Sequence, residues 1–250
     1  RILVIYNPRY DFTGSEAEAD QFNEIKKLDK FLDNENSMMV FFNADTPHLP
    51  TLDEYLEKWC ISVIRETDEA GDAQNALLKD PSTSLSADGQ TVVGSYASEG
   101  AGASITSDMR GVGNPPKVVF RNAMPVEIAD AYEEAFYVDE ESGVKASYGY
   151  KNLGSTSREI WNIFSSGTSA KTHAAGKEVG SAGANDPYGL MTLSIQRRLT
   201  QEDNYGASFA DGSSYVLACG STDFAIEALL NSNAYGNSEV LLKALVSMGK

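Results

Sequence analysis

Ile2-Leu3-Val4-Ile5-Tyr6 is an unbroken run of aliphatic and aromatic residues, and it ends at Asn7-Pro8. Five such residues are too few for a helix and fit a β-strand that is buried on both faces. Strands of this kind are typical of parallel sheets covered by helices on each side, so the run predicts an α/β fold.

Alternating helix and strand patterns follow this first strand. Thr13–Glu16 opens a helical pattern in which Ser15 can cap the helix and Glu18 can complete a capping box, and apolar residues at helical spacing from Phe22 to Leu32 give this helix one apolar face. A second buried run predicts a strand at 38–42. A short helix is expected at 52–59 and a third strand at 61–64. Because strand–helix–strand–helix order needs crossover connections, we expect an open, mostly parallel sheet flanked by helices.

The middle of the chain is less regular. Residues 80–113 are rich in Ser, Gly and Ala, with short extended pieces expected at 91–96 and 103–106. A strand is expected at 117–121 and a polar loop over 165–186, while 129–138 fits helix and strand equally well. We therefore expect one α/β domain over 1–250, with a possible irregular insertion at 80–186.

Regular patterns return near the end of the chain. An extended segment is expected at 190–197 and a buried strand at 215–219. Ser221-Thr222-Asp223 leads into a helix, and a last helix carries apolar residues from Val240 to Val246.

The composition restricts the possible partners. The formal net charge is −16, and hydrophobic residues make up 42% of the chain, which suffices for a sizeable core. A field of this sign repels phosphate backbones and anionic lipid surfaces, so we expect no nucleic-acid partner. With two cysteines, two histidines and no CxxC pair, we expect neither a metal site nor a cofactor.

No catalytic signature is assembled in the sequence. A nucleophile elbow needs small residues on both sides of Ser or Cys, and no G-x-S-x-G or G-x-C-x-G is present. We therefore expect a non-catalytic protein. The alternative is an amidotransferase-like or esterase-like hydrolase, which would need His48 or His173 beside Ser221, Cys219 or Cys60. Cys60 and Cys219 are expected to be buried thiols, and their pairing stays open.

Polar residues follow three of the expected parallel strands. In open parallel sheets, ligands bind outside the carboxyl ends of the strands, so these residues form a candidate binding crevice. They also suit turns and helix caps. The six candidates are Asn7, Asp11, Asn43, Asp45, Ser221 and Asp223.

A second alternative is a carbohydrate-binding module. Tyrosine rings supply flat faces on which sugars stack, although the same rings also suit a core. Four tyrosines of the middle region are the candidates for this role: Tyr132, Tyr137, Tyr148 and Tyr150.

The two ends of the chain together resemble a known family. The start carries the run at 2–8, then Asp11-Phe12-Thr13, an acidic helix closing at 31–34, and the segment 52–59. The end carries the strand at 215–220, Ser221-Thr222-Asp223-Phe224 and a final Leu-rich helix. These features resemble the extracytoplasmic domain of GldG-type auxiliary proteins of ABC transport systems, named for gliding motility.

This resemblance implies a fold, a location and partners. It implies a flavodoxin-like sheet related to class I glutamine amidotransferases, without glutaminase activity because the nucleophile motif is missing here. It also implies a parent protein that is anchored by membrane segments outside this chain, at the extracytoplasmic face of the cytoplasmic membrane. The expected partners are an ABC permease and ATPase, with a possible envelope or small-molecule ligand.

Overall fold

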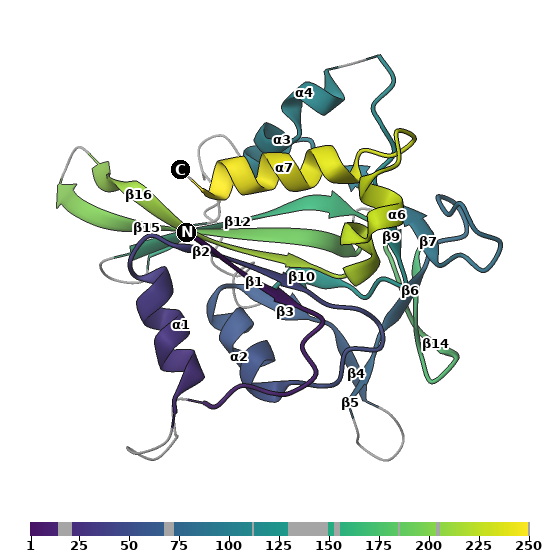
Figure 1. Ribbon diagram of the computed structural model, residues 1–250, viewed down its shortest axis with the longest axis horizontal. Coiled ribbons are helices and arrows are strands. Elements are labelled where there is room, and N and C mark those ends of the chain that lie inside the picture. Colours follow the sequence, from purple (N-terminus) through teal and green to yellow (C-terminus); the bar gives the residue numbers. More distant parts are fainter. Residues whose placement is uncertain are drawn as a thin grey trace.

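A seven-stranded mixed sheet forms the centre of the computed structural model, as Figure 1 shows. The structure describes residues 1–14, 22–67, 73–111, 113–129, 150–152, 156–184, 186–203 and 206–249. The strands run in the order β1-β2-β16-β15-β12-β11, and β8 also pairs with β12. Their bounds are β1 Ile2–Tyr6, β2 Ser37–Phe41, β8 Ser95–Tyr96, β11 Tyr150–Asn152, β12 Thr156–Ser165, β15 Gly189–Asp203 and β16 Gly206–Cys219.

The prediction of a mostly parallel, flavodoxin-like or amidotransferase-like sheet is wrong. Only β1, β2 and β16 are parallel neighbours, whereas β16, β15, β12 and β11 pair antiparallel. The reason is that β15 and β16 follow each other without a crossover helix, and such a connection produces antiparallel pairing. The middle of the chain is also no irregular insertion, because β8, β11 and β12 complete the same sheet as β1 and β2.

The first strand lies at the edge of this sheet. The expectation that it is buried on both faces is wrong, because the exposed fraction is 52% for Val4 and 49% for Tyr6. The second strand, β2, fits the expectation, since β1 and β16 lie on its two sides and all five of its residues are buried.

Helices cover both faces of the sheet (Figure 1). On one face lie α1 (Glu24–Leu32) and α2 (Pro50–Lys58). On the other lie α3 (Gly100–Ile105), α4 (Ser107–Arg110) and α7 (Asn237–Met248), with the short η1 (Thr222–Ala225) and α6 (Glu227–Leu230) before α7. None of the helices among the described residues is long and apolar enough to cross a membrane.

Side-chain alternation along the strands creates two cores. Met38 and Val40 of β2 pack with α1 and α2, whereas Met39 and Phe41 pack with the core beneath α7. Successive side chains of a strand point to opposite faces, so each central strand contributes to both cores. The three layers are therefore helices, sheet and helices.

Four small antiparallel sheets flank these layers. They are β3 (Ile61–Val63) with β10 (Val126–Ile128), β4 (Arg65–Thr67) with β5 (Ala73–Asn75), β7 (Thr91–Val93) with β9 (Val119–Arg121), and β6 (Leu77–Lys79) with β13 (Lys171–Ala174) and β14 (Lys177–Ser181). Two expectations are corrected here. The polar stretch 165–186 contains a hairpin rather than a loop, and 103–106 continues a helix rather than a strand.

Candidate functional site

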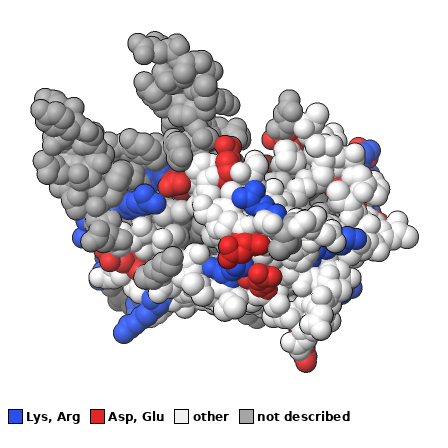
Figure 2. Space-filling view, turned by 90° about the horizontal axis from the view of Figure 1, so that it is seen from above, with Lys and Arg blue, Asp and Glu red and all other residues white. Residues whose placement is uncertain are grey.

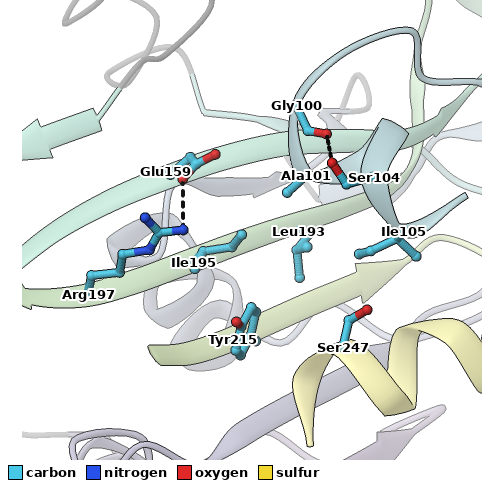
Figure 3. A pocket seen from close by; sticks show the side chains of 10 residues that line it. All are labelled: Gly100, Ala101, Ser104, Ile105, Glu159, Leu193, Ile195, Arg197, Tyr215 and Ser247. Carbon is cyan, nitrogen blue, oxygen red and sulfur yellow. Dashed lines mark hydrogen bonds and ion pairs between the residues drawn. The ribbon is translucent and has the colours of Figure 1, made fainter. Parts of the chain in front are cut away.

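An open groove of about 550 Å³ lies between α3 and α7, over the face of β12, β15 and β16 (Figure 3). This volume is within the usual range of small-molecule sites. Strand residues form the floor, α3 forms one wall and Ser247 of α7 lies opposite. The lining residues are Gly100, Ala101, Ser104, Ile105, Glu159, Leu193, Ile195, Arg197, Tyr215 and Ser247.

Strand register places the floor residues on one face. Leu193, Ile195 and Arg197 are spaced two residues apart along β15, so their side chains point to the same side. Ile195 pairs with Glu159 of β12 and with Tyr215 of β16, which gives a cross-strand row over three strands. The sequence alone predicted an extended segment at 190–197 but not the partners that complete this row.

The charged end of the groove is an oriented ion pair. The Arg197 guanidinium lies 3.8 Å from Oε2 of Glu159, and the indole N–H of Trp161 donates to Oε1 of the same carboxylate. Glu159 is therefore held from two sides. The exposed fraction is 22% for the Glu159 side chain and 46% for the Arg197 side chain, so both charges remain accessible to a ligand.

Glycines let the α3 wall approach the sheet closely. A Cβ on Gly100, whose φ is +64°, would fall within the ring of Trp161. A Cβ on Gly102 would overlap the backbone carbonyl of Asn162 in β12. Neither the Trp161 ring beneath Gly100 nor the backbone carbonyl beneath Gly102 leaves room for a Cβ atom. These two glycines therefore determine how closely α3 approaches the groove floor.

We expect Gly102→Ala to displace α3 and to lower the free energy of unfolding by about 1–3 kcal/mol, the usual cost of overpacking. Thermal unfolding and Trp161 fluorescence should report the loss of stability and the shift of the wall. Gly113→Ala is the control, since a Cβ there meets no atom within 4 Å. Equal melting temperatures for the two variants would contradict this account of the wall.

Three of the six predicted crevice residues belong to the turns after β1 and β2. The side-chain oxygen of Asn7 accepts from Thr46 at 3.0 Å, and that of Asn43 accepts from the backbone N–H of Ala44 at 2.9 Å. Asp45 forms an exposed ion pair with Arg9 at 3.1 Å. The contacts of Asn7 and Asp45 join the loop after β1 to the loop after β2, whereas that of Asn43 stays within its own turn.

The other three also have partners within the fold. Asp11 accepts from the first backbone N–H groups of α2, at 3.0 and 3.2 Å. Burial raises its pKa, but the hydrogen bonds from Thr51 and Leu52 outweigh that effect and lower it overall. Ser221 donates to the carbonyl of Arg121, and Asp223 accepts from the Asn122 amide at 3.0 Å. The binding role of the six stays a prediction, and none of them lines the groove.

Cys219, Ser221 and His48, which the hydrolase alternative considers, have other partners in the structure. Complete burial raises the pKa of the Cys219 thiol to about 12, so it carries almost no thiolate at neutral pH. Ser221 donates to a backbone carbonyl, and His48 lies 3.7 Å from Asp53. Within the described ranges, no hydrogen bond joins an imidazole to Cys219 or Ser221. Cys60 and Cys219 are buried and form no disulfide with each other.

The residues of the carbohydrate alternative are mostly outside the described part of the chain. Tyr132, Tyr137 and Tyr148 lie in an undescribed segment, and Tyr150 begins β11. The described residues also include no group of three or more His, Cys, Asp or Glu that could hold a metal ion.

The face that carries α3 and α7 is not dominated by one sign of charge. Figure 2 shows that its described surface is mostly uncharged, with basic and acidic side chains in small mixed groups. Lys243 of α7, for example, pairs with Asp108 at 2.9 Å and lies 3.8 Å from Glu239. The net charge of −16 therefore does not prevent a neutral or zwitterionic ligand from approaching this face.

Comparison with known proteins does not place the chain in a family. No protein-family model matches the sequence, and no curated protein matches it significantly.

Proposed function

We propose that this chain is a non-catalytic binding domain and that the groove between α3 and α7 is its binding site. The groove carries the proposal, because an apolar floor, an accessible ion pair and hydroxyl groups converge on one open concavity. Such a combination is typical of ligand sites. Neither imidazole is among the groove residues, and the polar groups of the lining are the Glu159–Arg197 ion pair and the hydroxyl groups of Ser104, Tyr215 and Ser247.

We further propose that the domain belongs to an auxiliary subunit of an ABC transport system, anchored at the extracytoplasmic face of the cytoplasmic membrane. The resemblance at the two chain ends supports this proposal. The segments that carry it lie together in space, since β1, β2 and β16 are adjacent parallel strands. The expected partners are the permease and the ATPase of that system.

The test is co-purification of the full-length protein from its native membranes in mild detergent. We expect mass spectrometry to identify an ABC permease and an ATPase in the complex. Ser104→Trp, which places an indole in the groove wall, should reduce the recovered permease several-fold if the groove contacts the complex or its ligand. Ser238→Trp, on the exposed surface of α7, should leave recovery unchanged. Absence of both ABC components from the wild-type preparation would refute the transporter assignment.

A further inference from the structure

We propose that the groove binds an α-amino acid with a large apolar side chain, which rests on the proposed function of the groove as a binding site. The ligand's carboxylate would meet Arg197 and its ammonium group would meet Glu159. Its side chain would lie over Leu193 and Ile195 on the floor.

The ion pair at the end of the groove supports a ligand with both charges. Arg197 and Glu159 are 3.8 Å apart at their closest charged atoms, longer than a good charge-assisted hydrogen bond of about 2.7–2.9 Å. Each group therefore retains capacity for another partner. A zwitterion whose opposite charges are separated by a similar distance can align beside the pair, so that every charge faces its opposite.

A ligand of a single charge fits this end less well. A ligand with only a carboxylate would form an ion pair with Arg197 but would also lie near the Glu159 carboxylate. A ligand with only an ammonium group would form an ion pair with Glu159 but would lie near the Arg197 guanidinium. Because like charges at such distances repel, a zwitterion is favoured over either singly charged analogue.

The orientation of the Glu159 side chain is set before a ligand arrives. The indole N–H of Trp161 holds one carboxylate oxygen of Glu159 and leaves the other turned toward Arg197 (Figure 3). The Arg197 guanidinium makes no hydrogen bond to another described side chain or backbone group, so its N–H groups can bind a carboxylate in a bidentate manner. Such preorganisation reduces the entropy lost on binding.

The floor selects the side chain of the amino acid. Leu193 and Ile195 are almost fully buried at the base of the groove, so the accessible apolar surface comes mainly from the partly exposed Ala101 and Ile105 of α3 and from Tyr215. An aromatic or long aliphatic side chain would cover this surface and displace water from it. The groove volume of about 550 Å³ accommodates such a side chain.

Four matched probes test the proposal: L-phenylalanine, 3-phenylpropionate without the ammonium, phenethylamine without the carboxylate, and L-serine without the apolar ring. Trp161 lies directly under the groove wall, so intrinsic fluorescence and isothermal titration calorimetry should follow binding. We expect phenylalanine to bind at least ten-fold more tightly than each of the other three.

Variants assign the charges. Arg197→Gln should weaken phenylalanine at least ten-fold but leave phenethylamine unchanged or tighter. Glu159→Gln should weaken phenylalanine similarly but leave 3-phenylpropionate unchanged or tighter. Arg198→Gln is the control, because it removes the same charge from the neighbouring residue, which does not line the groove. Circular dichroism checks that each variant folds. If a variant does not fold, the comparison of the four probes on the wild-type protein still tests the proposal.

Two outcomes overturn the inference. One is equal affinity for phenylalanine and either singly charged analogue. The other is no binding of phenylalanine at millimolar concentration. Neither outcome decides whether the groove is a binding site for a partner protein, because the co-purification experiment with Ser104→Trp tests that separately. A wrong ligand class can therefore be distinguished from a wrong proposed function.

Discussion

Replacing Phe120 by alanine is expected to lower the free energy of unfolding by about 3–5 kcal/mol, the usual cost of removing a large buried aromatic side chain. Phe120 is completely buried, and its ring lies 5.6 Å from that of Phe164 in β12 and 5.2 Å from that of Phe224 in η1. These rings join the small β7–β9 sheet to the main sheet. The substitution would leave a cavity between β9, β12 and η1 and would weaken the packing of all three elements.

Urea denaturation followed by circular dichroism measures this effect. Tyr10→Ala is the control, because Tyr10 is 88% exposed and its removal should change stability by less than about 0.5 kcal/mol. A Phe120→Ala protein as stable as Tyr10→Ala would show that the three-ring cluster does not hold the small sheet in place.

Replacing Asp80 by asparagine is expected to lower the free energy of unfolding at neutral pH by about 2–3 kcal/mol, because hydrogen bonds to a buried charge are lost. Asp80 is completely buried. Its carboxylate accepts from both the backbone and the hydroxyl groups of Ser82 and Thr83, and from the Gly167 N–H at 2.7 Å. In asparagine, an NH₂ group replaces one acceptor and faces these donors.

The same substitution should change the pH dependence of stability. Burial raises the pKa of Asp80, but the hydrogen bonds from Ser82, Thr83 and Gly167 outweigh it and lower the pKa overall. The folded-state pKa is then below the unfolded one, so ionised Asp80 stabilises the fold above about pH 4. That contribution is lost as pH falls through the folded-state pKa.

Denaturation curves of wild type and Asp80→Asn between pH 2 and pH 7 test this account. The difference in stability should be constant near neutral pH and should shrink at acid pH. Asp45→Asn, which removes an exposed ion pair with Arg9, should cost less than about 1 kcal/mol at every pH. A difference for Asp80→Asn that does not vary with pH would contradict the proposed ionisation.

Local sequence patterns determined the elements at the two ends of the chain. The run at 2–6, the helix at Pro50–Lys58 and the final helix at Asn237–Met248 are found where their periodicity predicts them. Helix and strand periodicity depend on neighbours within a few residues, so they can be read from one sequence. The cap of α1 is not the predicted one, because Asn23 accepts from the Lys26 N–H of the first turn, whereas the sequence favoured Ser15, which lies outside the described residues.

Only the tertiary structure decided which strands pair and in which direction. The pattern over 1–64 predicted crossover connections throughout, but β3 leaves the main sheet for β10, and β12, β15 and β16 pair antiparallel. The candidate site depends on that pairing, because Glu159, Arg197 and Tyr215 meet only in the observed register. Strand partners and register are set by packing between residues far apart in the chain, which no local pattern encodes.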